Sequence, residues 1–366
     1  MNRSPRPAAG AGAAPDRGAR TAPGARPRLL VLRALGLGDL LTAVPALRAL
    51  RRAHPGHELV LAAPGRLAEA VAATGTVHTL LPTTAADRAV PDRLEWTGPP
   101  PDLAVDLHGN GPPSHRLLAA LRPARLLAYA RPGEAVPGPV WREDEHERGR
   151  WCRLLRWYGI PADPGDLRIP PPARPSPAPG AVVVHPGADA AARRWPARRF
   201  AAVARALAEA GHRVVITAGA GEAPLARAVA AGAGLPPAAV LGGTGDVPFP
   251  DLAAVLAHAR VVVVGDTGPA HLATALGTPS VVLFGPVAPR LWGPPPLHRH
   301  RVLWHPDSTA PRPGDAHGTR PDPRLLRIGV PEVLAAVAAA TGPAPGPAGP
   351  TTVRRPRTTL TPGGRR

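Results

Sequence analysis

A buried-type strand that runs directly into a small-residue turn and a helix start constrains this chain most. Residues 261–264 are four valines, as expected of a parallel strand that is buried on both faces. Residues 265–268 break the strand. Pro269 suits the first helical position because it has no N–H to leave unpaired, which would make Gly268 the N-cap. The free N–H groups of such a helix start favour an anion, so the stretch predicts an anion site.

Two interpretations of this turn remain open from the residues alone. Asp266 and Thr267 either hold the turn together or contact a bound ligand. His271 lies in the first turn of the expected helix, where it either adds a hydrogen bond or positive charge to the anion site or is satisfied locally. Gly277 ends the helix, as glycine often does.

The chain between its two ends repeats one pattern of strand, turn, helix and strand. Such alternation predicts parallel sheets with helices on both faces, and two copies predict two doubly wound, Rossmann-like domains. The first copy has strands at 28–33 and 58–62 and a helix at 40–52, and the second has strands at 181–185 and 212–217 and a helix at 197–210.

Composition divides the chain into five parts. Both ends are rich in Pro, Gly, Ala and Arg and poor in large apolar residues, so they are expected to be disordered. A proline-rich stretch separates the two strand patterns and is expected to be a semi-rigid linker. The predicted parts are a basic tail 1–27, a first domain 28–169, a linker 170–180, a second domain 181–340 and a basic tail 341–366.

The formal net charge of +18 raises the question of an anionic partner. Residues 1–28 and 341–366 each carry +5, so more than half of the excess lies at the ends. The tails could therefore bind nucleic acid or an anionic membrane. The chain contains no lysine, however, and its Ala, Pro and Arg content is typical of a GC-rich genome. The positive charge is therefore better explained by the composition of the genome than by an anionic partner.

The lengths of the apolar segments argue against a membrane-spanning protein, and the single cysteine argues against a protein stabilised by disulfides or a cysteine-bound zinc ion. No apolar run reaches the length of a membrane-spanning helix and the start lacks a signal core, so a cytoplasmic protein is expected, with at most peripheral membrane contact. Cys152 is alone, which leaves no disulfide framework or thiolate zinc cluster, and it is expected to be buried.

Residues 266–273 (DTGPAHLA), followed by 277–279 (GTP) and 283–285 (LFG), resemble glycosyltransferase family 9, the ADP-heptose:lipopolysaccharide heptosyltransferases. The resemblance covers about residues 28–65 and 180–290. It implies the GT-B fold, in which two Rossmann-like domains face each other across a cleft. It also implies that the second domain binds a nucleotide-sugar donor and the first binds the acceptor.

The resemblance assigns the base that would deprotonate the acceptor hydroxyl to Asp39. The family has an aspartate at this place, in a Gly-Asp pair followed by a pattern that ends in Pro-Ala-Leu. A helix N-cap is the alternative role for Asp39. Gly38, Asp106 and His108 close strand ends in the same domain and are weaker acceptor-side candidates.

The donor-side candidates are those that suit a diphosphate and its sugar. Arg193 stands where the family carries a lysine that contacts donor phosphate, and Arg194 is beside it; a solvated surface pair is the alternative. Glu222 corresponds to the family's acidic residue near the donor ribose, or is a plain helix-start acid. Asp266 would repel a diphosphate, so it is expected to bond a sugar hydroxyl or loop N–H groups. Thr267, Gly268 and His271 complete the predicted diphosphate site.

No metal or other cofactor is expected. The sequence holds no Asp-x-Asp pair of the kind that clamps a metal in other glycosyltransferases. The acidic stretch 143–147 lies in a polar segment and is interpreted as a solvated face.

The sequence thus predicts an inverting, metal-independent glycosyltransferase that transfers a sugar, expected to be heptose from ADP-heptose, to a glycan or glycolipid hydroxyl. Two alternatives stay open: a sugar-nucleotide epimerase or hydrolase on the same fold, and a basic protein that binds nucleic acid or anionic membrane through its tails.

Overall fold

The computed structural model describes residues 26–85, 88–242, 247–307 and 314–343. These residues fall into two compact units, which divide between Pro172 and Ala173, except that the short segment Arg290–Trp292 belongs to the first unit. The division lies inside the proline-rich stretch that was expected to be a linker. The predicted tails lie almost wholly outside the described residues.

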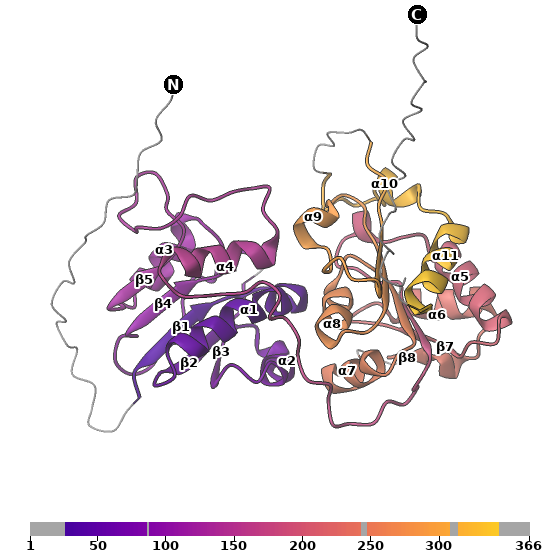
Figure 1. Cartoon of the computed structure of the whole chain (residues 1–366), viewed down its shortest axis with the longest axis horizontal. Helices are drawn as coiled ribbons and strands as arrows, with labels where there is room; N and C mark the ends of the chain where they lie inside the picture. The colour runs from indigo at the N-terminus through magenta and orange to yellow at the C-terminus, as the bar shows by residue number, and fades with distance from the viewer. Residues whose placement is uncertain (1–25, 86–87, 243–246, 308–313, 344–366) are drawn as a thin grey trace, which may run out of the picture. The chain divides into compact units, whose positions relative to one another are not determined.

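The first unit is a five-stranded parallel sheet with helices (Figure 1). The strand order is β3-β2-β1-β4-β5, and every neighbouring pair is parallel. Its elements are β1 (Arg28–Leu32), α1 (Leu37–Ala53), β2 (Glu58–Ala63), α2 (Ala68–Ala73), β3 (Thr79–Pro82), β4 (Leu103–Asp106), α3 (Pro112–Ala119), β5 (Arg125–Leu127) and α4 (Glu147–Trp157).

The second unit repeats the design with six parallel strands in the order β11-β10-β9-β6-β7-β8. Its strands are β6 (Val182–His185), β7 (Val214–Thr217), β8 (Val240–Leu241), β9 (Val261–Gly265), β10 (Ser280–Leu283) and β11 (His300–Leu303). The helices of this part of the chain are α5 (Ala197–Glu209), α6 (Ala223–Ala233), α7 (Phe249–Ala257), α8 (Gly268–Leu276), α9 (Pro289–Trp292), α10 (Pro323–Leu326) and α11 (Val330–Thr341).

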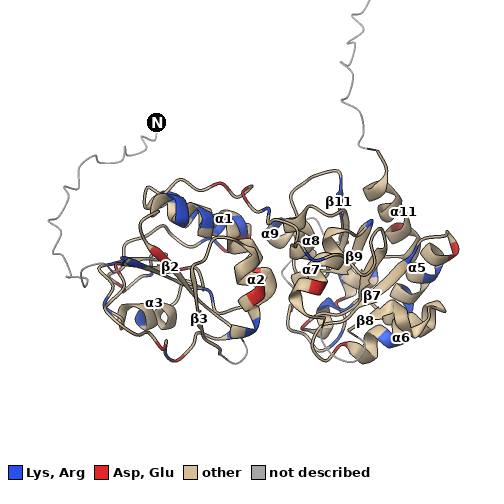
Figure 2. Ribbon diagram, turned by 90° about the horizontal axis from the view of Figure 1, so that it is seen from below, with Lys and Arg blue, Asp and Glu red and all other residues tan. Residues whose placement is uncertain are grey.

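Aliphatic strands form the core of each sheet, as the sequence predicted. All residues of β4, β6, β7, β9 and β10 are buried, which fits strands covered on both faces. Several arginines lie on the helices, among them α1, α5 and α6 (Figure 2). The prediction of two doubly wound parallel-sheet domains is confirmed.

Two helix starts differ from the predictions. Helix α1 begins at Leu37 rather than near residue 40, so Gly38 and Asp39 lie in its first turn and Gly36 is the N-cap. Helix α8 begins at Gly268 and its N-cap is Thr267, so Gly268 is not the cap. A proline is accepted anywhere in the first turn, where N–H groups lack helical partners, so it fixes a helix start only to within a residue. Gly277 ends α8, as predicted, and its φ of 74° lies in the left-handed region.

None of the helices in the described residues is long and apolar enough to cross a bilayer. Cys152 is buried in α4, as expected.

Candidate functional site

Each sheet reverses its direction of growth at one point, and the predicted site residues follow the strands at these points. The reversal lies between β1 and β4 in the first sheet and between β6 and β9 in the second. Doubly wound sheets bind ligands beyond the carboxyl ends of the strands at such points. Asp39 follows β1 and Asp106 is the last residue of β4, while Arg193 and Asp266 follow β6 and β9. Each unit therefore has a candidate site where its topology favours one.

Asp39 is held in the first turn of α1 with only 4% of its surface exposed. Its Oδ2 accepts a hydrogen bond from the Gly36 N–H at 3.1 Å, which satisfies one of the donors at the helix start. The predicted alternative, in which Asp39 is itself the N-cap, is wrong because the helix begins two residues earlier. Its carboxylate nevertheless supports the cap, from the third helical position.

Arg88 is a partner of Asp39 that the sequence analysis did not select. Its Nη2 donates to Oδ1 and Oδ2 of Asp39 at 2.9 and 2.8 Å, and its side chain is 39% exposed. Its backbone φ of 61° lies in the left-handed region, which is unusual for a residue other than glycine. Both oxygens of the predicted base are therefore occupied by a guanidinium from the segment after β3.

His108 and Asp106 complete this side of the first sheet. The Nδ1 atom of His108 accepts the Ala34 N–H at 3.2 Å, and burial, followed by the charge of Arg33, lowers the pKa of the ring to about 4. Asp106 is fully buried and its Oδ1 accepts the N–H groups of His108 and Gly109. Burial raises the pKa of Asp106. His108 thus lies beside Asp39, whereas Asp106 shapes the turn from inside the protein.

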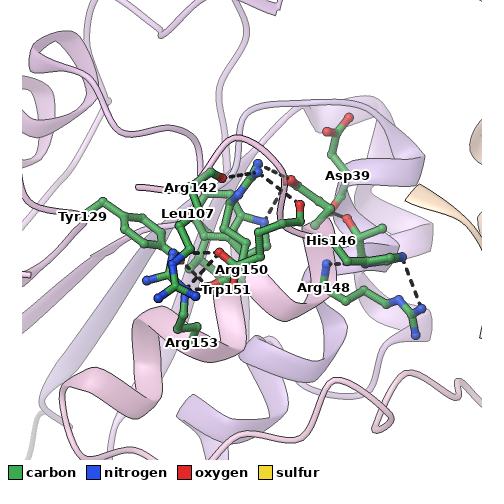
Figure 3. A network of polar contacts seen from close by, with 12 residues as sticks. Asp39, Leu107, Tyr129, Arg142, His146, Arg148, Arg150, Trp151 and Arg153 are labelled. Carbon is green, nitrogen blue, oxygen red and sulfur yellow. Dashed lines mark hydrogen bonds and ion pairs between the residues drawn. The ribbon is translucent and has the colours of Figure 1, made fainter. Parts of the chain in front are cut away.

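Arg33 is a second residue that the sequence analysis missed, and it is only 1% exposed. It follows β1 and joins the backbone of Asp39 to Glu147 of α4. Figure 3 shows the surrounding polar contacts, with Asp39, Leu107 and Trp151 labelled. Glu147 is 5% exposed, so the interpretation of residues 143–147 as a solvated face is wrong for this residue. Glu145 also pairs, with Arg153 at 2.7 Å. Glu143 and Asp144 are exposed, as expected.

The candidate anion site of the second unit is the start of α8. The hydroxyl of Thr267 donates to the Gly265 carbonyl at 3.4 Å, and Gly268 begins the helix without a side chain. His271 lies one turn further, with Nε2 3.9 Å from Oδ1 of Asp266. The structure therefore brings these four predicted donor-side residues together.

Arg193 and Arg194 follow β6 and have different surroundings. Nη1 of Arg193 donates to the carbonyl of Asp266 at 3.3 Å, which places its guanidinium beside the start of α8. Its Nε is buried and has no hydrogen-bond partner in the described part of the chain. Arg194 is exposed and its Nε donates to the Ala188 carbonyl at 2.8 Å. Of the two, only Arg193 is placed beside the predicted anion site by these bonds.

Glu222 is held in the loop after β7 and against the loop after β6. Its Oε2 accepts the Gly219 N–H at 2.8 Å and lies 3.4 Å from Nε2 of His185. A Cβ at Gly187 would fall 2.0 Å from the Glu222 carboxyl carbon, so the glycine is what allows this approach. Burial lowers the pKa of His185. The predicted acidic residue thus lies against the end of β6, next to the switch point.

The match to a known protein family lies almost wholly in the second unit. Residues 173–312 match the model of "Glycosyltransferase family 9 (heptosyltransferase)". The lipopolysaccharide heptosyltransferase 3 of Escherichia coli is 37% identical over 115 residues, which are 31% of this chain and 33% of that protein. The chain thus matches about a third of the length of this curated relative.

Solved structures are similar over most of the chain. The glycosyltransferase family 9 structure from Veillonella parvula has a TM-score of 0.68 at 19% identity, covering 86% of this chain and 97% of that one. The E. coli ADP-heptose lipopolysaccharide heptosyltransferase II has a TM-score of 0.65 at 19% identity, covering 86% and 98%. Both units therefore share the fold of these two-domain proteins.

Another similar structure bears on the question of a metal. The dodecameric glycosyltransferase TibC of E. coli, with a TM-score of 0.53 at 15% identity, is described as iron-containing and covers 85% of this chain and 75% of that one. In this chain, no group of three or more His, Cys, Asp or Glu within the described ranges could hold a metal ion. The expectation of a metal-independent reaction stays a prediction.

The resemblance noted in the sequence is confirmed by these findings. The family model, the curated relative and the solved structures agree on one family. Residues 173–312 therefore resemble glycosyltransferase family 9 (heptosyltransferase), and both units share the fold of a solved structure described as a member of that family.

Proposed function

We propose that this protein is an inverting glycosyltransferase that transfers heptose from ADP-heptose to a hydroxyl group of a lipopolysaccharide-type glycan or glycolipid. The family and the printed names of the relatives support the donor and the acceptor class. The alternative of an epimerase or hydrolase has no specific observation in its favour.

The observation that carries the proposal is the guanidinium of Arg193 beside the start of α8. The helix start offers backbone N–H groups and the positive end of the helix dipole, and Arg193 adds a full charge. A guanidinium binds phosphate oxygens in a planar, two-bond geometry that an ammonium group cannot reproduce. The arginine in place of the family's lysine therefore keeps the charge and changes the contact.

The remaining donor-side roles follow from charge. Thr267, Gly268 and His271 would bind the diphosphate, and Glu222 would bind a ribose hydroxyl. Asp266 lies beside His271 and Arg193, so it would accept a bond from a sugar hydroxyl rather than approach the phosphates. Arg194 would contribute at most to the surrounding field, because it bonds Ala188 instead.

In the reaction, Asp39 would take the proton of the acceptor hydroxyl while the oxygen of that hydroxyl forms a bond with the anomeric carbon of the donor sugar. The bond from that carbon to the diphosphate oxygen breaks on the opposite face, and the electron pair leaves with ADP. The positive groups around α8 stabilise the charge that develops on the diphosphate. Attack and departure on opposite faces invert the anomeric centre.

The ion pair with Arg88 sets one requirement for this step. Both oxygens of Asp39 accept from Arg88, so the guanidinium must move aside or share the carboxylate before a hydroxyl can bind. The Arg88 side chain is 39% exposed, whereas that of Asp39 is only 6% exposed, so the acceptor hydroxyl must replace the guanidinium as a partner of this buried carboxylate.

Calorimetric titration of the full chain with ADP, GDP and UDP tests the donor site. We expect ADP to bind most tightly and Arg193→Ala to weaken that binding at least about 10-fold, the loss of a charged hydrogen bond. Arg194→Ala is the matched control and should keep the wild-type affinity. Equal losses in both variants would show that the two arginines act only through general charge and would refute the site.

Release of ADP from ADP-heptose, measured with and without a lipopolysaccharide core acceptor, tests the reaction. Asp39→Asn should lower turnover by about 10²–10⁴ while ADP binding is unchanged. Free heptose formed at the same rate without acceptor would instead identify a hydrolase. The cytoplasmic location and the membrane contact of the basic tails stay predictions.

A further inference from the structure

Arg33 is the most connected buried charge on the acceptor side. Its Nε donates to the backbone carbonyl of Asp39 at 3.1 Å, and its Nη1 donates to the backbone carbonyl of Leu107. Its Nη2 donates to the Thr42 hydroxyl at 3.4 Å and lies 3.6 Å from Oδ1 of Asp39. One side chain therefore joins the first turn of α1 to the residues that follow β4.

Glu147 is the counterion that makes this arrangement stable. Its Oε1 accepts from Arg33 at 2.8 Å and from the Trp151 indole N–H at 2.9 Å, and its Oε2 accepts from Arg150 at 2.9 Å. The Arg33 guanidinium also lies over the Trp151 ring, 4.9 Å from its centroid. A guanidinium that is 99% buried needs such pairing, because an isolated buried charge is strongly unfavourable.

The partners of Arg33 lie on three different segments of the first unit. They come from α1, from the end of β4 and from α4, and the contact with Glu147 spans 114 positions of sequence. The three contacts to α1 all reach its first turns, where Asp39 lies (Figure 3). The network therefore fixes the backbone that carries the predicted base, while the Asp39 carboxylate bonds Gly36 and Arg88 and lies 3.6 Å from Arg33.

We propose that Arg33 and Glu147 are positioning residues that hold Asp39 in its reactive place, with Glu147 acting through Arg33. The inference rests on the proposed function for the role of Asp39. It adds two residues that hold the backbone of Asp39 in place. An error of about 1 Å in the place of a reacting group lowers a rate by about 10²-fold, which sets the size of the expected effect.

Two variants and a matched control test the proposal. Arg33→Gln removes the charge and the fork of donors, while Glu147 keeps Arg150 and Trp151, so the fold is expected to persist. Glu147→Gln keeps the shape and an acceptor for Arg33. Arg48→Gln is the control. Arg48 lies on α1, the helix that carries Asp39, and its partner Asp166, 2.7 Å away, belongs to no candidate site.

The first readout is independent of activity. Hydrogen–deuterium exchange of the peptide covering residues 34–44 should be faster in Arg33→Gln and in Glu147→Gln than in the wild type, and unchanged in Arg48→Gln. Unchanged exchange in Arg33→Gln would overturn the proposal even if the protein proved to have another function.

The second readout separates positioning from general damage. Arg33→Gln should lower kcat for ADP-heptose turnover about 100-fold and leave KM for ADP-heptose within about threefold. In the Asp39→Asn background the same change should lower kcat by less than about threefold, because a positioning residue has little left to position. Equal losses in both backgrounds would overturn the proposal. If the wild type shows no turnover, the proposed function fails and the exchange experiment alone decides.

Discussion

Replacement of Gly187 by alanine would test how the donor-side loops fit together. The added Cβ would lie 2.0–2.1 Å from the three carboxyl atoms of Glu222, whereas ordinary contacts begin near 3.4 Å. The Glu222 carboxylate must therefore move by more than an ångström. It then loses its bond with the Gly219 N–H, now 2.8 Å long, and its place 3.4 Å from His185.

The magnitude follows from the bond that is lost. A hydrogen bond to a charged group contributes about 1.5–3 kcal/mol, so Gly187→Ala should lower the free energy of unfolding by about that amount. In the Glu222→Ala background the space is empty, and the same substitution should cost less than about 0.5 kcal/mol. The coupling between the two positions is then about 1.5–3 kcal/mol.

Urea denaturation followed by circular dichroism measures all four proteins of this cycle. Gly56→Ala is the control, because no atom lies within 4 Å of its added Cβ and its φ is outside the left-handed range. If Glu222 also contacts the donor, Gly187→Ala should weaken ADP binding about 10-fold or more. Additive effects of the two substitutions would refute the assignment of Gly187 as the space for Glu222.

Two further predictions concern buried titratable groups. The pKa of His108 is lowered to about 4, chiefly by burial, so the unfolded chain binds more protons than the folded one between pH 6.5 and 4. Stability should fall by up to about 3 kcal/mol as the pH decreases through that window, and His108→Asn should remove most of this dependence of Tm on pH. Burial raises the pKa of the Cys152 thiol to about 12, so iodoacetamide at pH 8 should label the protein only after unfolding in guanidinium. Rapid labelling of the folded protein would contradict that burial.

Local patterns predicted the framework well. The strands around residues 182–185 and 261–265, and the helix that ends at Gly277, follow from aliphatic runs and from glycine or proline at their ends. These signals act over a few residues, and a short sequence contains them. The first residue of α1 and of α8 was misplaced because several residues of a first helical turn satisfy the same local rules.

Long-range contacts account for what the sequence could not give. Nothing near residues 143–147 indicates that Glu147 pairs with a buried arginine 114 positions earlier. Arg88 has no local signal either, and its contact with Asp39 depends on how the segment after β3 returns to α1. The predicted site residues were those with a motif around them, whereas their partners are defined only by the fold.

The place of α4 in the chain has a consequence for how the protein is made. All five strands of the first sheet precede residue 128, whereas Glu147 begins the later helix α4. While the ribosome is still adding this helix, the sheet strands are complete but Arg33 has no carboxylate from α4. Burial of the Arg33 guanidinium is therefore unfavourable until α4 docks and Glu147 pairs with it. Docking of α4 and completion of the Asp39 region are then a single step, and a newly made chain positions its predicted base only when α4 has docked.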